Sequence, residues 1–174
     1  MNRISVRKAV SLVTVLVWMA VIFSFSAQKA EASSEVSGSL TSHLLTEVCQ
    51  TFSLDWDEDT LVKYAQKLEH PIRKAAHMTE YAILACLICN CLYQYGCRRR
   101  YFLRAELLTA CYAASDEIHQ LFVPGRSGQI SDVCIDAAGA GIGLLILYGI
   151  ISMIRHLLIK KNMHGISGTE KFHV

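Results

Sequence analysis

Four long apolar windows constrain this chain more than any other feature of its sequence. They cover roughly residues 9–25, 75–95, 103–123 and 133–158. Each is close to the ~20 residues that a helix needs to cross the hydrocarbon core of a bilayer. Hydrophobic residues make up 52% of the 174-residue chain and charged residues only 18%, which is fewer charges than a typical soluble domain carries. The sequence therefore predicts an all-α fold, an integral membrane four-helix bundle.

The expected organisation is a single membrane domain over residues 1–174. Its predicted parts are membrane spans at residues 9–26, 74–95, 102–123 and 132–156, a loop at 27–72 and a tail at 157–174. The third span is the weakest by hydropathy, because polar residues gather at its end. The first window could instead be a cleaved signal peptide, since both begin with basic residues, but its length favours a retained helix.

Lysine and arginine are distributed unevenly between the two sides of the predicted bundle. They precede the first window, crowd the turn between the second and third, and follow the core of the fourth. The positive-inside rule then places both termini of this multi-pass protein of the cell membrane in the cytoplasm. The 27–72 loop is extracytoplasmic and largely acidic. The chain has a net charge of +2 and no nucleic-acid motif, so we expect membrane lipids as partners and no nucleic acid.

The predicted extracytoplasmic loop is too long for a plain connection and has helical patterns of its own. Apolar residues from Leu40 to Phe52 recur at helical spacing and predict a short amphipathic helix on the membrane surface or over the bundle. The acidic run after Asp55 is typical of a helix start. It predicts a second helix over about residues 60–69, which runs toward Pro71.

Polar residues gather at the outer ends of all the windows. In the second window Arg73, His77 and Tyr81 follow one another at i, i+4 and i+8, so they share one helix face. The third and fourth windows and the turn between them carry the others: Asp116, Glu117, His119, Gln120, Arg126, Asp132 and Asp136. Ionisable groups at membrane depth cost about 2.5–3.5 kcal/mol each, so they persist only with partners and usually mark a function. We expect a cavity open to the extracytoplasmic face.

These residue types permit several kinds of chemistry. Arg73, Lys74 and Arg126 could bind an anionic group such as phosphate or carboxylate, and arginine is suited to a bidentate contact. The carboxylates could hold a divalent cation together with a histidine. We nevertheless predict no metal site, and the sequence identifies no cofactor. A carboxylate beside a histidine could also act as general acid and base. Ser127 and Ser131 could be nucleophiles, but nothing marks either as activated.

A structural interpretation competes with each of these functional ones. Arg126 with Asp132, and Arg73 with Asp116 or Glu117, could be buried ion pairs that hold the helices together. The small residues that follow Asp136 on the same helix face, Gly139, Ala140 and Gly143, are typical of a surface that lets a neighbouring helix approach closely.

Several motifs resemble those of VanZ-like membrane proteins over nearly the whole chain. They are Phe25-Ser-Ala-Gln28, Arg73-Lys-Ala-Ala-His77-Met-Thr-Glu-Tyr81, Asp116-Glu-Ile-His119-Gln120-x5-Arg126 and Asp132-x3-Asp136-x2-Gly139-x3-Gly143. The last two together are the most specific, and Asp136 stands where many members have Asn. The resemblance implies an integral membrane protein associated with low-level resistance to glycopeptide antibiotics, to teicoplanin more than to vancomycin. It implies no particular reaction.

Three functional hypotheses compete. The outer cavity could bind a lipoglycopeptide or a lipid-linked envelope precursor and so reduce drug access. The protein could instead be a membrane-embedded hydrolase or transferase that acts on a lipid-linked or phosphorylated envelope substrate, or it could have a transport or scaffold role. The catalytic candidates are Glu117, His119, His77 and Asp116. The ligand-binding candidates are Arg73, Tyr81, Gln120, Arg126, Asp132 and Asp136.

Overall fold

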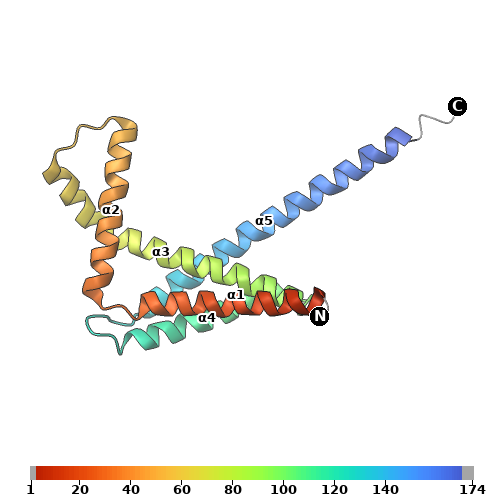
Figure 1. Ribbon diagram of the computed structural model, residues 1–174, viewed down its shortest axis with the longest axis horizontal. Coiled ribbons are helices and arrows are strands. Elements are labelled where there is room, and N and C mark those ends of the chain that lie inside the picture. The colour runs from red at the N-terminus through yellow and green to blue at the C-terminus, as the bar shows by residue number, and fades with distance from the viewer. Residues whose placement is uncertain (1–2, 170–174) are drawn as a thin grey trace.

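Five helices make up the protein, and the predicted all-α class is confirmed. The computed structural model describes residues 3–169, and this part of the chain contains no strand. The helices are α1 (Arg3–Ser26), α2 (Ala30–Phe52), α3 (Glu58–Gln94), α4 (Tyr101–Gln120) and α5 (Ile130–Thr169). Figure 1 shows α1, α3 and α4 running along one another, α2 turned away from them, and α5 extending beyond them.

Three of the helices are long and apolar enough to cross a membrane. The candidate spans are Ile4–Ser26 in α1, Glu58–Gln94 in α3 and Ile130–Lys160 in α5. Within the described residues α4 does not reach the same apolar character, because charged residues lie at both of its ends. It instead turns Ala105, Thr109 and Ala113, spaced four apart, into the core, where all three are fully buried. The third predicted span, at residues 102–123, and the orientation of the termini therefore stay predictions.

The helix with the most extensive packing is α3, which contacts all four other helices. Its approach to α5 depends on two glycines. A Cβ added at Gly139 would lie 2.5 Å from the backbone oxygen of Met78, and one at Gly143 would lie 2.8 Å from the Ala82 Cβ. These distances are too short for any larger residue, so the glycines pack helix against helix, as the small-residue pattern predicted.

The predicted break before the second span is wrong. Instead of a short helix over 60–69 and a separate span, α3 runs without interruption through Pro71. A proline inside a helix loses one backbone hydrogen bond and usually kinks or ends it. Here the neighbouring turns are held by α2, because Ser37 Oγ donates to Glu69 Oε1 at 3.0 Å and Arg73 Nη1 donates to Ser34 Oγ at 3.2 Å.

The predicted helix start in the acidic run is confirmed. Asp57 is the N-cap of α3, and its carboxylate accepts a hydrogen bond from the Thr60 amide at 3.3 Å. Hydrogen bonding by Thr60, first through its side chain and then through its amide, lowers the pKa of the Asp57 carboxyl below its ordinary value. Just before it, α2 ends at Ser53, whose backbone is left-handed with φ of 52°, a conformation common at helix ends.

The predicted amphipathic helix is present, but it is longer than expected. Residues 30–39, which precede the predicted helix, form its first turns, and α2 packs on α3. Its buried side is the polar one, with Ser37 and Thr41. The apolar side, with Leu40, Leu44 and Phe52, stays exposed. This exposed side suits a membrane surface.

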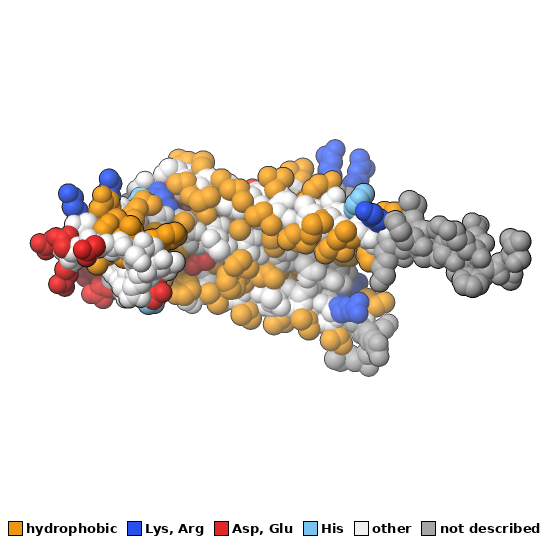
Figure 2. All heavy atoms as spheres, turned by 90° about the horizontal axis from the view of Figure 1, so that it is seen from above, with side chains coloured by type: hydrophobic (Ala, Val, Ile, Leu, Met, Phe, Trp, Pro, Cys, Tyr) orange, Lys and Arg blue, Asp and Glu red, His pale blue; other side chains and the backbone are white. Residues whose placement is uncertain are grey.

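The fourth predicted span is also longer than expected, since α5 extends from Ile130 to Thr169. The part of the predicted tail from 157 to 169 is therefore helical, and residues 170–174 lie outside the described chain. Large apolar side chains such as Leu145, Ile146 and Tyr148 are exposed along it. Figure 2 shows hydrophobic side chains along the length of the molecule, with acidic side chains gathered at the end formed by α2 and the start of α3.

Candidate functional site

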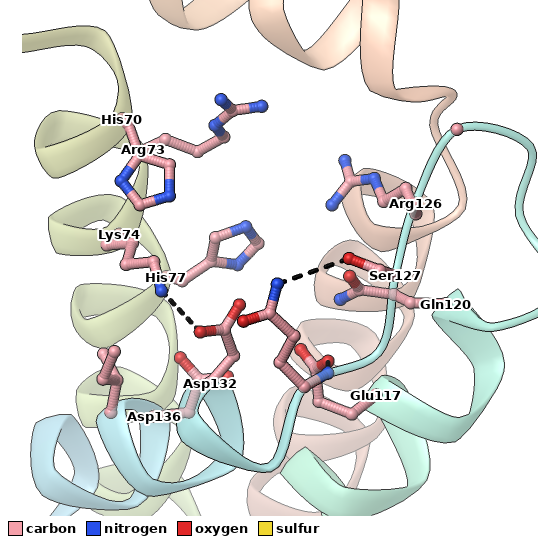
Figure 3. A pocket seen from close by; sticks show the side chains of 13 residues that line it. His70, Arg73, Lys74, His77, Glu117, Gln120, Arg126, Ser127, Asp132 and Asp136 are labelled. Carbon is pink, nitrogen blue, oxygen red and sulfur yellow. Dashed lines mark hydrogen bonds and ion pairs between the residues drawn. The ribbon is translucent and has the colours of Figure 1, made fainter. Parts of the chain in front are cut away.

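A polar cavity lies where α4 ends and α5 begins, with the middle of α3 as its opposite wall (Figure 3). Its volume is about 180 Å³. Seven of the ten residues predicted for a site line it: Arg73, His77, Glu117, Gln120, Arg126, Asp132 and Asp136. They come from three helices and one loop, so no single segment of sequence contains the cavity.

Helical spacing explains how each wall presents more than one functional group. Arg73 and His77 are one turn apart on α3, and Asp132 and Asp136 are one turn apart on α5. Residues at i and i+4 lie on the same helix face. The last turn of α4 adds Glu117 and Gln120.

Apart from Lys74, whose ammonium group pairs with Asp132, the positively and negatively charged side chains of the cavity lie in two groups. Figure 3 shows the side chains of Arg73 and Arg126 pointing into the opening from opposite sides, with His77 between the walls. The carboxylates of Glu117, Asp132 and Asp136 lie deeper, toward α5 (Figure 3). We call the first group the cationic rim, formed by Arg73, His77 and Arg126, and the second the acidic floor, formed by Glu117, Asp132 and Asp136.

Arg126 connects the loop before α5 to the end of α1. Its Nε donates to the backbone oxygen of Gln28 at 3.0 Å, and its Nη2 donates to that of Phe25 at 3.5 Å. Within the described chain it has no carboxylate partner. Burial, and next the positive charge of Arg73, lower the pKa of Arg126, but a guanidinium stays protonated in proteins. Arg126 is thus a half-buried cation beside a second cation.

The structure contradicts the ion pairs that the structural interpretation expected. Arg73 pairs with Glu69 at 3.1 Å, one turn earlier on its own helix. Asp132 pairs with Lys74, whose Nζ lies 2.5 Å from Oδ1, and not with Arg126. The continuity of α3 through Pro71 places Glu69 one turn before Arg73, so these two side chains meet on one helix.

Two carboxylates of the acidic floor differ in their surroundings. Glu117 is 7% exposed, and its Oε2 accepts a hydrogen bond from the Gln129 amide at 2.9 Å. This bond holds the loop against the end of α4, where a Cβ at Gly128 would lie 2.5 Å from the Glu117 backbone oxygen. Asp136 is 5% exposed and lines the cavity, yet within the described residues it makes no hydrogen bond or ion pair. Among the described residues, Asp136 is thus a buried carboxyl that faces the cavity with no hydrogen-bond or ion-pair partner, although it interacts electrostatically with His77.

Three predicted site residues lie outside the cavity lining. Asp116 accepts from the Gln120 side-chain amide at 3.2 Å, while its other oxygen and the Tyr81 hydroxyl are buried without a hydrogen bond. His119 packs its ring against Phe23, with ring centroids 4.4 Å apart. These three residues therefore belong to the interior beside the cavity, and their candidate roles stay predictions.

Beyond the ten predicted site residues, the sequence had suggested Lys74 for anion binding and Ser127 as a nucleophile, and both line the cavity. The lining residues that the sequence did not suggest are His70, Gly125, Gln129 and Ile135. Lys74 follows Arg73 directly, and its spacing from the acidic residues of α5 gave no signal because the two helices are far apart in sequence. Gln129 donates its backbone amide to Glu117, so the residue type at position 129 could not have indicated this contact.

A metal centre is not supported by the geometry. In the described part of the chain, no three His, Cys, Asp or Glu side chains converge as metal ligands. The chemistry that remains is anion binding at the rim, cation or proton binding at the floor, and proton transfer through His77. The Nδ1 of His77 lies 3.4 Å from Glu80 Oε2, an ion-pair distance that lacks hydrogen-bond geometry.

These features define a helical membrane protein with a polar cavity built from α3, α4 and α5. The chain belongs to the VanZ/LLP1 family, whose model matches residues 11–154. The match includes every residue that lines the cavity, and it confirms the resemblance seen in the motifs. No curated protein and no solved structure matches the chain.

Proposed function

We propose that this VanZ-like protein acts at the extracytoplasmic face of the cell membrane, where its polar cavity binds an anionic envelope molecule. This activity would serve the cell envelope or give low-level resistance to teicoplanin. The observation that carries the proposal is Arg126, a half-buried cation that faces the cavity beside Arg73 without a carboxylate partner. An arginine pair of this kind is suited to phosphate or carboxylate.

The distribution of charge supports the extracytoplasmic position. The turn between α3 and α4 holds Arg98, Arg99 and Arg100 and lies at the opposite end of α4 from the cavity. Basic turns favour the cytoplasmic side. The acidic side chains gather instead at the end of the molecule formed by α2 and the start of α3 (Figure 2).

The size of the cavity favours a native envelope molecule over the antibiotic itself. Sites for drug-sized ligands usually measure about 300–1,000 Å³, and this cavity measures about 180 Å³. It can accept a head group but not a whole glycopeptide. Protection against teicoplanin would then arise because the protein withdraws or remodels a membrane component near the drug target.

An enzymatic role is the second candidate, and the pairing of His77 with Glu80 favours it. A carboxylate beside an imidazole can orient the ring and stabilise its charged form during proton transfer. His77 lines the cavity, so a bound phosphoryl or ester group would meet a general acid or base. The protein would then be a membrane-embedded hydrolase or transferase that acts on a lipid-linked or phosphorylated envelope substrate.

The test is growth inhibition of a sensitive host by teicoplanin and vancomycin, with the membrane level of each protein measured. We compare wild type with Glu117→Gln, Arg126→Ala and, as a matched control, Arg99→Ala, which removes an exposed arginine far from the cavity. We expect wild type and Arg99→Ala to protect against teicoplanin more than against vancomycin, and Arg126→Ala to lose protection while still present in the membrane. Absence of protection by wild type would refute the resistance role.

His77→Asn separates the two candidates, because it removes the titrating ring and keeps a polar side chain of similar size. Protection that persists in this variant supports binding without catalysis. Protection that disappears, although the variant is present at the wild-type level and still binds the membrane component, supports an enzyme.

A further inference from the structure

A second hollow adjoins the polar cavity and is mainly apolar. It lies between the end of α1, the first half of α2 and the middle of α3. Its apolar lining includes Phe25, Val36, Leu40 and Ile72. We call it the apolar hollow. A hollow of this kind accepts a hydrocarbon chain, because burial of each CH₂ group contributes about 0.8 kcal/mol.

The two hollows share one wall, and that wall is the cationic rim. Arg73, His77 and Arg126 line both the polar cavity and the apolar hollow. A ligand bound across this wall would have its anionic group at the arginines, its chain on one side and the remainder of its head on the other. This order of groups is that of an amphiphile with a phosphate near its chain.

The charge balance of the cavity specifies the remainder of the head. Of the three basic side chains in the lining, Arg73 pairs with Glu69 and Lys74 pairs with Asp132, which leaves Arg126 without a carboxylate partner in the described chain. Of the carboxylates, Asp136 has neither a hydrogen bond nor an ion pair among the described residues. A purely anionic head would satisfy Arg126 but leave the buried Asp136 without a partner, and an unpaired buried charge is costly. A head with both a phosphate and a hydrogen-bonding cation would satisfy both groups at once.

We propose that the site binds a zwitterionic phospholipid whose head carries a primary ammonium group, with phosphate at Arg73 and Arg126, ammonium at Asp136 and one acyl chain in the apolar hollow. This inference rests on the proposed function, because it takes the polar cavity as the binding site and adds the class of ligand. A primary ammonium donates hydrogen bonds to a carboxylate, whereas a quaternary ammonium has no N–H to donate. The Asp136 carboxylate is therefore expected to favour an ethanolamine head group over a choline head group.

The test measures lipid binding to the purified full-length protein in a neutral detergent by native mass spectrometry. The probes are phosphatidylethanolamine, phosphatidylcholine and phosphatidylglycerol with identical acyl chains, together with soluble glycerophosphoethanolamine. We expect phosphatidylethanolamine to bind at least about tenfold more tightly than the other lipids, as the loss of one charge-assisted bond implies. Equal binding of phosphatidylglycerol overturns the ammonium assignment, and equal binding of the soluble head group overturns the assignment of the chain.

Variants locate each part of the ligand. Arg126→Gln weakens all three lipids, because each has the phosphate. Asp136→Asn weakens phosphatidylethanolamine alone and reduces its preference over phosphatidylglycerol. Leu40→Ser weakens lipid binding, whereas Leu44→Ser does not: the two leucines are 46% and 45% exposed on the same helix, and only Leu40 lines the hollow. Equal effects of the two leucine variants would contradict the proposed chain position.

The two proposals fail in different ways. If wild type gives no protection against teicoplanin but prefers phosphatidylethanolamine, the resistance role fails and the ligand assignment stands. If protection depends on Arg126 but the protein shows no lipid preference, the cavity functions with another ligand and the present inference is overturned.

Discussion

Arg126 and Gln28 are 98 positions apart in the sequence, yet the Arg126 Nε donates to the Gln28 backbone oxygen across 3.0 Å. This bond joins the loop before α5 to the end of α1, and it turns the guanidinium toward both hollows. Arg126 thus links the end of α1 to the loop before α5, and it also supplies the cation of the candidate site.

The first prediction concerns this bond. Arg126→Ala removes both donors and leaves the Gln28 backbone oxygen without this partner, while the Phe25 oxygen still accepts from the Gln28 amide at 3.2 Å. We therefore expect a loss of about 1–3 kcal/mol in the free energy of unfolding. Gln28→Ala keeps the backbone oxygen and should remain close to wild type. Thermal unfolding of the two variants in the same detergent checks this, and similar destabilisation by both would show that the Gln28 side chain carries the contact instead.

The second prediction concerns the approach of α5 to α3. Gly139→Ala places a Cβ against the Met78 backbone, and we expect the overpacking to cost about 1–3 kcal/mol. Gly149→Ala is the matched control, because it lies on the same helix with nothing within 4 Å of the added Cβ. It should raise helix stability by about 0.5–1 kcal/mol, the ordinary gain of alanine over glycine. Opposite signs of the two changes are the expected result in chemical or thermal unfolding.

The third prediction concerns Lys74 and Asp132, which join α3 to α5 at the floor of the cavity. We expect the destabilisations caused by the single replacements, Lys74→Met and Asp132→Asn, to add up to more than the destabilisation caused by the double replacement. The coupling energy from the double-mutant cycle should be about 0.5–3 kcal/mol. A coupling of zero would mean that the two side chains do not interact in the folded protein.

The fourth prediction concerns pH and the start of α3. Hydrogen bonds from the Thr60 side chain and amide lower the pKa of Asp57 in the folded protein. The carboxylate therefore stabilises the fold above the ordinary Asp pKa of about 3.9, and this contribution is lost as the pH falls through the lower folded value. The difference in thermal stability between wild type and Asp57→Ala should be present at neutral pH and shrink in acid. Asp55 is an exposed acid outside the cap, so Asp55→Ala should have the same thermal stability as wild type at neutral pH.

The sequence by itself determined the helices and much of their chemistry. Runs of apolar residues near the length of a membrane span, the acidic start before Thr60 and the glycine spacing in α5 are local patterns, and local backbone preferences act on them directly. They also determined the family, since its motifs lie within continuous segments. Helical spacing was enough to place Arg73 with His77, and Asp132 with Asp136, on shared faces.

Tertiary structure alone decided how those faces meet. A helical pattern states which residues share a face, but packing against neighbours sets the rotation of each helix about its axis. Packing therefore turned His119 toward Phe23 and buried Asp116 in the interior, while Glu117 reached the cavity. It also gave Arg126 backbone oxygens as partners, which no side-chain pattern can reveal because every residue has one.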